Sequence, residues 1–293
     1  LVTNELMTMT FRAYQFEQAV LKDKTNVASP HTTAYGDMQV LANYGDMMNG
    51  AAGGIYANVD DLAQWMLVHL NKGAYGEQLK DTLFTRQNQN EMWMIHTTTR
   101  NNGNPRYNTH FTGYGLGWDL QDKKGNMVVS HTGGLPGMLS RTVLIPDLNL
   151  GIVVLTNTEP GGAGLFEGVS RTLVDSYLGL DDYDWINKFV SYFEERGEKS
   201  NAVVDAVWET VKSVGTTKVK NEDYIGIYKD PWFGNVEVFL NYGKLWMKCH
   251  RSPKLNGPMS YYKANTFAVK WEYQDMNADV FAMFNLDENG KAQ

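Results

Sequence analysis

The sequence has 293 residues, which is long for one average domain and fits two. Apolar residues make up 43% of it and aromatic residues 12%, so the chain can bury a substantial core, and its composition excludes disordered and fibrous proteins. Its 26 basic and 33 acidic residues give a net charge of −7 without a basic stripe, which argues against nucleic acid as a partner. No apolar run approaches the length that spans a membrane.

The cysteine content and the first residues set further bounds. Cys249 is the only cysteine, so neither a disulfide framework nor a cysteine-based metal site can form within the chain. Its alternating context predicts a buried, inert thiol. Leu1 to Glu5 has neither the basic nor the apolar region of a signal peptide, so no signal peptide is expected in this chain. A start without methionine indicates a fragment or a processed form.

The first 112 residues predict loops and one clear helix. Residues 1–50 are poorly periodic and favour loops and short turns. Asn58 can cap a helix that Gly73 ends, and the apolar face of this helix carries Leu62, Trp65, Met66, His69 and Leu70. On that face, His69 is expected to be a core histidine with satisfied ring nitrogens rather than a ligand. Residues 74–112 predict mostly helix and loop.

Strands follow from residue 114. Alternation predicts a strand over Tyr114 to Leu120, a turn at Asp122 to Asn126, and a second strand that reaches His131. Ser140 to Leu155, with a turn at Pro146 to Asn149, predicts a hairpin. Because these strands are adjacent in sequence, we expect them to form an antiparallel sheet.

The rest of the chain predicts more helices and a second group of strands. An apolar stripe predicts a helix over 164–178 that packs across the sheet. Two more charged helical patterns, at 183–196 and 201–213, predict a linking segment. From about residue 217, short alternating strands separated by turns predict a small all-β unit, a barrel or a sandwich.

Together these patterns predict an α+β fold. We expect an antiparallel sheet with packed helices at residues 1–180, a helical linker at 181–216 and a small all-β, barrel-like domain at 217–293. The task of the β domain stays open, because it could cover a cleft, mediate self-association or bind a wall polymer.

The segment from Val128 to Gly137 is the strongest candidate for a site. An apolar strand becomes polar at His131 and Thr132 and then opens into glycines, and its periodicity fails at Gly133. A glycine inside a strand marks a bulge or the close approach of another chain or a ligand. Such a polar strand end would form a substrate edge. On spacing alone, a strand that runs into a Gly-Pro turn explains the pattern at least as well.

Other catalytic patterns are absent or misplaced. The six histidines and the one cysteine show no metal-ligand spacing, and neither a phosphate-binding loop nor a dinucleotide fingerprint occurs, so we expect no metal and no cofactor. The Gly-x-Ser-x-Gly elbow is missing. One Ser-x-x-Lys pattern, Ser260 to Lys263, lies in a predicted strand, where positions i and i+3 do not share a face, so we interpret it as chance.

His131-Thr132-Gly133, with strands before it and a hairpin after it, resembles the third motif of the serine β-lactamase and penicillin-binding-protein superfamily. The likeness is to its class C-like and esterase-like branch, and it covers nearly the whole chain. Residues 223–291 resemble the small β domain appended to some members. Further segments fit the same branch: Ala28 to His31, Ala51 to Ile55, Asp60 to Ala63 and Asn157 to Gly162.

The resemblance implies a serine hydrolase that acts through an acyl-enzyme on peptide, ester or amide substrates. His131 and the Thr132 hydroxyl would face the substrate and orient or pair with its carboxylate. Gly133 would let the substrate backbone lie along the strand edge, and the Gly134 N–H would be one of two oxyanion donors. A histidine where other members have lysine weakens the fixed positive charge near neutral pH, which favours esters or D-amino-acid peptides over lactam antibiotics.

The family's Ser-x-x-Lys nucleophile and its tyrosine motif belong upstream of anything in this chain. Tyr56 to Asn58 spells the tyrosine motif but lies inside a later segment, so that role is not carried over. The chain therefore resembles the later part of such an enzyme and is expected to be inactive alone.

The resemblance also implies a bacterial periplasmic or secreted protein with a small-molecule or peptide substrate. A missing N-terminal segment or a second copy of the chain stays open as a partner. The alternative function is a non-catalytic binding or regulatory module on the same fold. A Ser-x-x-Lys encoded upstream of Leu1 would favour the enzyme, and a natural start at Leu1 would favour the module.

Overall fold

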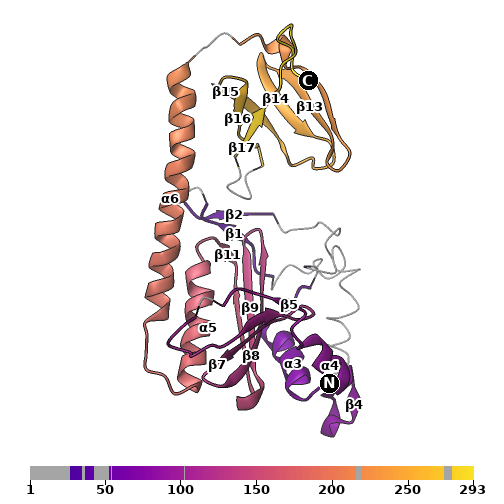
Figure 1. Cartoon of the computed structure of the whole chain (residues 1–293), viewed down its shortest axis with the longest axis vertical. Helices are drawn as coiled ribbons and strands as arrows, with labels where there is room; N and C mark the ends of the chain where they lie inside the picture. The colour runs from indigo at the N-terminus through magenta and orange to yellow at the C-terminus, as the bar shows by residue number, and fades with distance from the viewer. Residues whose placement is uncertain are drawn as a thin grey trace. The chain divides into compact units, whose positions relative to one another are not determined.

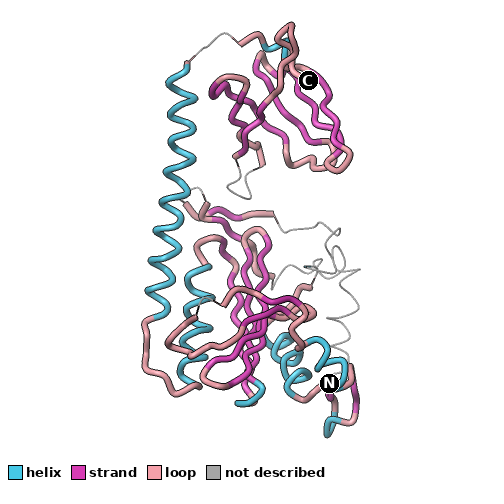
Figure 2. The backbone as a smooth tube through the Cα atoms, viewed as in Figure 1, coloured by secondary structure: helices cyan, strands magenta, loops and turns pink. Residues whose placement is uncertain are grey.

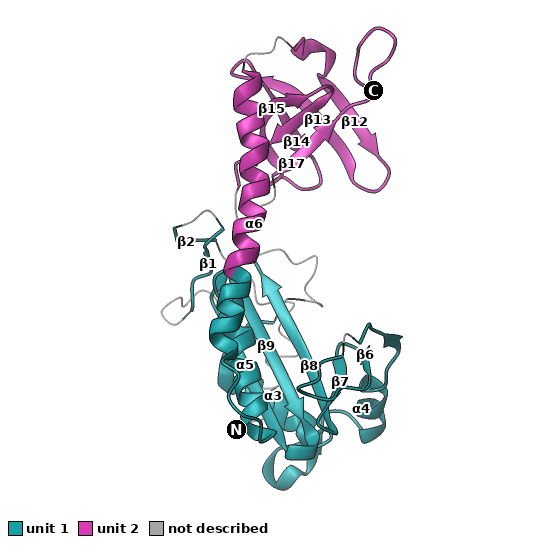
Figure 3. Ribbon diagram, turned by 60° about the vertical axis from the view of Figure 1, so that its left-hand side comes forward, with its two compact units in different colours: residues 1–193 teal, residues 194–293 magenta. Residues whose placement is uncertain are grey.

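The computed structural model describes residues 27–34, 37–42, 53, 55–101, 103–215, 219–273 and 279–293 (Figure 1). The chain divides into two compact units, residues 1–193 and 194–293 (Figure 3), and the boundary falls inside helix α6 (Trp185–Val214). Each unit has its own sheet and its own apolar core. The finer division at residues 180 and 216 stays a prediction.

The first unit is built on a six-stranded antiparallel sheet, whose strands are magenta in Figure 2 and partly labelled in Figure 1. The strand order is β10-β9-β8-β7-β6-β5. Its antiparallel arrangement and its β9–β10 hairpin confirm the predicted sheet. The strands are β5 (Thr97–Thr98), β6 (Thr112–Tyr114), β7 (Asp119–Lys123), β8 (Asn126–Leu135), β9 (Met138–Ile145) and β10 (Leu150–Thr156).

The prediction of one strand over Tyr114 to Leu120 is wrong. The segment forms the end of β6 and the start of β7, and the chain reverses between them. The reversal is closed by the Gly115 N–H, which donates to the Trp118 carbonyl oxygen at 2.8 Å. The apolar alternation therefore spans the end of one strand, a reversal and the start of the next strand, with Trp118 and Leu120 buried in the core.

Two helices cover opposite faces of this sheet (Figures 1 and 3). Helix α3 (Val59–Leu70) packs Met66 against Val129 and its neighbours, and helix α5 (Ala163–Tyr177) packs Val174 against Val128 and its neighbours. Because adjacent residues of a strand point to opposite faces, the two cores lie on the two sides of β8. Both helices confirm their predictions.

The predicted cap of α3 is confirmed by a reciprocal pair of hydrogen bonds. The Asp61 N–H donates to Asn58 Oδ1 at 3.0 Å, and the Asn58 N–H donates to Asp61 Oδ2 at 3.3 Å. Such a capping box satisfies backbone donors at a helix N-terminus. Asn58 is thus a cap, which agrees with leaving the Tyr-x-Asn pattern without a catalytic role.

Shorter elements fill the remaining described parts of the first unit. Residues 74–112, predicted to be mostly helix and loop, contain one seven-residue α-helix and several two- or three-residue elements. Across the first unit, the short elements outside the main sheet are β1 (His31–Thr32), β2 (Gln39–Val40), β3 (Ala74–Tyr75), η3 (Glu77–Leu79), β4 (Asp81–Thr82), α4 (Arg86–Met92), η4 (Pro146–Leu148) and β11 (Thr158–Glu159).

Helix α6 is one continuous helix of 30 residues, where the sequence predicted two. Its first turns lie close against α5, since a Cβ at Gly168 would collide with the backbone of Ile186 and one at Gly164 with that of Val190. Buried Asp175 of α5 also accepts a hydrogen bond from Trp185 Nε1 at 2.6 Å. These contacts fix the start of α6 on the first unit.

The second unit is a six-stranded antiparallel sheet with its strands in sequence order from β12 to β17. It confirms the predicted small all-β domain, whose curled sheet encloses a core rich in aromatic side chains such as Tyr224, Phe267 and Trp271. η5 (Asn221–Asp223) precedes the strands, which are β12 (Gly226–Asp230), β13 (Gly234–Asn241), β14 (Lys244–Cys249), β15 (Asn256–Lys263), β16 (Thr266–Val269) and β17 (Val280–Met283).

Two smaller predictions concern the second unit. Cys249 is half-buried rather than fully buried, and burial raises the pKa of its thiol, which makes the reactive thiolate scarcer. Ser260 and Lys263 both lie on β15, so their spacing does not bring the amine over the hydroxyl. In the described ranges of the chain, none of the helices combines the length and the apolar character needed to cross a bilayer.

Candidate active site

The candidate site lies at the C-terminal end of β8. From Val129 to Leu135, β8 pairs with β9 without any shift of register, so the bulge that was one of two interpretations of Gly133 does not occur. The other interpretation, close approach, holds instead: a Cβ at Gly133 would collide with Ser140 Oγ on β9. A side chain at position 133 would therefore require the Ser140 hydroxyl on the neighbouring strand to move.

The outer edge of β8 is open at this end. Strand β7 pairs with β8 only as far as Ser130, which lies opposite Asp119, the first residue of β7. In the part of the chain that the structure describes, residues His131 to Leu135 therefore have no strand on their outer side. An unpaired strand edge offers backbone N–H and C=O groups to a further chain or ligand.

The hairpin geometry tells which backbone groups point to this open edge. The turn between β8 and β9 has two residues, so the flanking pair Leu135 and Met138 exchanges hydrogen bonds. Bonded pairs alternate along an antiparallel ladder, so Gly133 and His131 also bond to β9. The N–H groups of Thr132 and Gly134 consequently point away from β9, toward the open edge.

The predicted site residues are all accessible there. His131, Thr132 and Gly134 are exposed and Gly133 is half-buried. Since successive side chains alternate, those of His131 and Thr132 lie on opposite faces of the strand. All four residues lie along the open outer edge of β8. Their role in binding substrate stays a prediction.

Tyr114 is a further residue of the site, and the sequence patterns did not single it out. Its hydroxyl lies 3.0 Å from His131 Nε2, although it comes from the far end of β6. The position of the tyrosine just before the Gly-Leu-Gly-Trp segment is visible in the sequence, but nothing local links it to His131. The contact depends on where β7 begins.

Segments far apart in sequence meet around the turn at the end of β8. The His31 N–H lies 3.3 Å from the Gly137 carbonyl oxygen and 3.0 Å from that of Asn157. The Asn157 side-chain amide in turn donates to the Ser29 carbonyl oxygen at 3.0 Å. Strand β1 thus joins β11 in parallel beside the β8–β9 turn.

Two more contacts complete these surroundings. The position of a Cβ on Gly53 lies 3.7 Å from Leu135 Cδ2, so Gly53 lies near the end of β8. Glu159 Oε2 accepts a hydrogen bond from the Gly137 N–H at 3.3 Å, and burial raises the pKa of this carboxyl. Most of the sequence segments that resemble the family therefore have at least one described residue near the β8–β9 turn.

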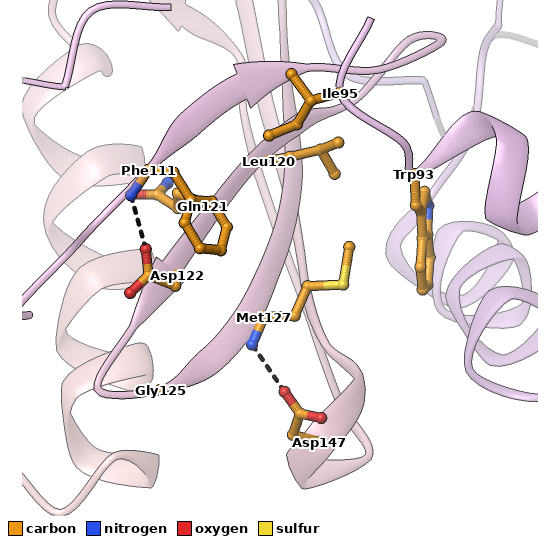
Figure 4. Close-up of a pocket in the computed structure, with 9 residues that line it drawn as sticks. All are labelled: Trp93, Ile95, Phe111, Leu120, Gln121, Asp122, Gly125, Met127 and Asp147. Carbon is orange, nitrogen blue, oxygen red and sulfur yellow. Dashed lines mark hydrogen bonds between the residues drawn. The ribbon is translucent and has the colours of Figure 1, made fainter. Parts of the chain in front are cut away.

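A cavity of about 260 Å³ lies at the other end of β8, near Met127 (Figure 4). Met127 lies four positions before His131, which is roughly 13 Å along a strand. Its walls are mainly apolar, and its two carboxylates accept backbone hydrogen bonds: Asp147 from the Met127 N–H at 2.7 Å and Asp122 from the Phe111 N–H at 3.1 Å. The cavity is separate from the candidate site.

His69 lies in the core, as predicted, but its ring nitrogens are not satisfied. The side chain is 1% exposed and sits among aromatic rings, and neither Nδ1 nor Nε2 has a hydrogen-bond partner. Burial lowers the pKa of its imidazole to about 4. The surrounding rings are those of Trp65, Phe84, Trp93 and Trp118.

Within the described residues no group of three or more His, Cys, Asp or Glu side chains could hold a metal ion.

The close approach at Gly133 gives a first prediction. Gly133→Ala is expected to lower the free energy of unfolding by about 1 kcal/mol, because the new methyl group drives the Ser140 side chain out of its rotamer. Urea unfolding measures the loss. In a Ser140→Ala background the hydroxyl is gone and the same change should cost nothing measurable; an equal loss in both backgrounds would refute the contact.

Parts of the chain match models of known protein families. Residues 3–171, more than half of the chain, match a family model described as "Beta-lactamase". Residues 212–293 match one described as "Domain of unknown function (DUF3471)". The "Unguisins hydrolase ungD" of Aspergillus violaceofuscus is 27% identical over 138 residues, which make up 44% of this chain and 24% of that protein.

The solved structures that match this backbone have low sequence identity to the chain. An octameric penicillin-binding protein homologue from Pyrococcus abyssi matches with a TM-score of 0.46 at 17% identity, over 94% of this chain and 52% of that one. SurE matches with a TM-score of 0.39 at 15% identity, over 91% and 53%. The chain thus spans about half the length of these proteins and about a quarter of the curated hydrolase.

Proposed function

The chain belongs to the β-lactamase family, and we propose that it forms the substrate-binding edge of a serine hydrolase that works through an acyl-enzyme. The observation that carries this proposal is the open outer edge of β8 at His131 to Leu135. Backbone donors there are free of any strand partner in the described residues, and they directly follow the buried part of β8, which pairs with strands on both sides.

In this proposal the Gly134 N–H binds the developing oxyanion. When a serine oxygen attacks the carbonyl carbon of an ester or amide, the carbonyl oxygen becomes negative and needs fixed hydrogen-bond donors. The N–H of Gly134 points to the open edge, and no side chain of its own covers it. The substrate would lie along the same edge, beside Gly133, with the Thr132 hydroxyl and the His131 imidazole as orienting groups.

We propose that the attacking serine and its base come from sequence outside these 293 residues. The chain's own Ser-x-x-Lys pattern, Ser260 to Lys263, lies on strand β15 of the second unit, where the two side chains do not share a face. Esters or D-amino-acid peptides are the proposed substrates, and the bacterial periplasm or the exterior is the proposed location.

Covalent probes test this proposal. The 293-residue chain and the longest product of its gene are each incubated with a fluorescent fluorophosphonate and a fluorescent penicillin, and the labelled peptide is mapped by mass spectrometry. We expect labelling of the longer protein, at a serine of a Ser-x-x-Lys, and none of the 293-residue chain.

Ser260→Ala is the matched control, and it should leave the labelling of the longer protein unchanged. Covalent labelling of the 293-residue chain itself would contradict the proposal. Absence of labelling in both proteins would favour the alternative, a non-catalytic binding module on the same fold.

A further inference from the structure

We infer that Tyr114 is a positioning residue that fixes the orientation and the tautomer of His131. The contact between Tyr114 and His131 is possible because of where strand β7 begins. Tyr114 lies opposite Asp119, and Asp119 lies opposite Ser130, so β7 separates β6 from β8 up to that point. Because β7 begins at Asp119, nothing of it stands beside His131, and the phenol of Tyr114 reaches across.

The contact is direct and leaves one ring nitrogen free. The Tyr114 hydroxyl oxygen lies 3.0 Å from His131 Nε2, and the two ring centres are 6.2 Å apart at an angle of 56°. In the described parts of the chain, Nδ1 of His131 has no hydrogen-bond partner. The imidazole is therefore held at one nitrogen and offers the other.

The backbone of Tyr114 is held on both sides. Its carbonyl oxygen accepts a hydrogen bond from the His96 N–H at 3.0 Å. The next residue, Gly115, packs so closely against the Met92 carbonyl oxygen that a Cβ there would collide with it, and the Leu116 N–H donates to the same oxygen at 2.9 Å. These contacts place the half-buried tyrosine before any substrate binds.

The chemistry of the pair decides the tautomer. A phenol is a stronger acid than a neutral imidazole, and an imidazole nitrogen is a stronger base than a phenol oxygen, so the Tyr114 O–H donates to Nε2. The proton of the neutral ring then sits on Nδ1. His131 becomes a fixed donor through Nδ1–H, which suits a carboxylate or carbonyl oxygen of the substrate. This consequence for catalysis rests on the proposed function.

Nuclear magnetic resonance of the full 293-residue chain tests the inference without any turnover. The six histidines are labelled with ¹⁵N, and His131 is assigned by the signals that disappear in His131→Gln. At alkaline pH, where imidazoles are neutral, we expect His131 to carry its proton mainly on Nδ1. In Tyr114→Phe the ratio of the Nδ1–H to the Nε2–H form should fall by about twofold to tenfold, as expected for the loss of one hydrogen bond.

Tyr177→Phe, at an exposed tyrosine of α5, is the control and should leave the ratio unchanged. A His131 that carries its proton on Nε2 in the unmodified chain, or a ratio that Tyr114→Phe does not move, would overturn the inference. The tautomer is read without substrate, so a failed covalent-labelling test would leave this result intact, and an unchanged tautomer would leave the labelling result intact.

Discussion

If the chain belongs to a serine hydrolase, as we propose, Gly134→Pro is expected to lower kcat of that enzyme by about 10²–10³-fold, the usual cost of removing one oxyanion donor. Proline has no N–H, and the Gly134 N–H points to the open edge of β8 rather than to β9. Proline is tolerated in strands where the lost N–H faces outward, so the fold should survive. The measurement is kcat on a chromogenic ester, with circular dichroism to verify folding.

Gly134→Ala is the matched control for this prediction. It keeps the N–H, and its new Cβ would meet Leu139 Cδ2 at 3.6 Å, which is an ordinary van der Waals contact. Its kcat should stay close to that of the unmodified protein. Equal losses in the proline and alanine variants would assign the effect to crowding, and an unchanged kcat in the proline variant would remove Gly134 from the oxyanion site.

The second large effect is a loss of stability in acid through His69. Its imidazole has a pKa of about 4 in the folded chain, against an ordinary value near 6.5 when the chain is unfolded. Between these values the unfolded state binds more protons, so stability falls as the pH falls from 6.5 to 4. The loss over this window is about 3 kcal/mol.

Urea unfolding at pH 7 and at pH 4 measures this loss. His69→Leu, which has no proton to bind and no buried nitrogen to satisfy, should lose about 3 kcal/mol less than the unmodified chain between the two pH values. His96→Gln, at an exposed histidine, should behave like the unmodified chain. If His69→Leu loses as much stability in acid as the unmodified chain, His69 is not the group responsible.

The elements that could be predicted are those with local signals. Asn58 caps α3 through its own side chain and the third helical residue, and the hairpin of β9 and β10 turns at Pro146 to Asn149. Each signal involves residues within a few positions of one another. The change from apolar to polar residues at His131 belongs to the same class, because it can be read directly along the sequence, although β8 itself continues to Leu135.

Features that depend on distant residues could not be predicted. Whether the edge of β8 is open depends on where β7 begins, and the sequence alternation runs through Tyr114 to Leu120 without marking that point. The Tyr114–His131 contact follows from the same boundary. Gly197 lies in the charged middle of α6, and a glycine there destabilises a helix by about 1 kcal/mol relative to alanine, so the local sequence favours two helices. The continuous helix shows that the other residues of α6 offset this cost.

The unsatisfied nitrogens of His69 illustrate a different limit. Helical periodicity places the residue on the apolar face of α3, and that part is confirmed. Its hydrogen bonding depends on which side chains arrive from elsewhere in the chain, and these are the rings of Phe84, Trp93 and Trp118. The periodicity of α3 alone does not show which side chains from other segments will surround His69.

The crystal structure of the longest product of the gene, after reaction with a phosphonate ester, tests the proposed function most directly. The phosphonyl oxygen of the adduct stands where the oxyanion of an acyl-transfer intermediate would be. We predict that it lies about 2.7–3.1 Å from the Gly134 nitrogen, with the rest of the adduct along the edge from His131 to Leu135. An adduct bound elsewhere, with the outer edge of β8 covered by another part of the protein, would contradict the account.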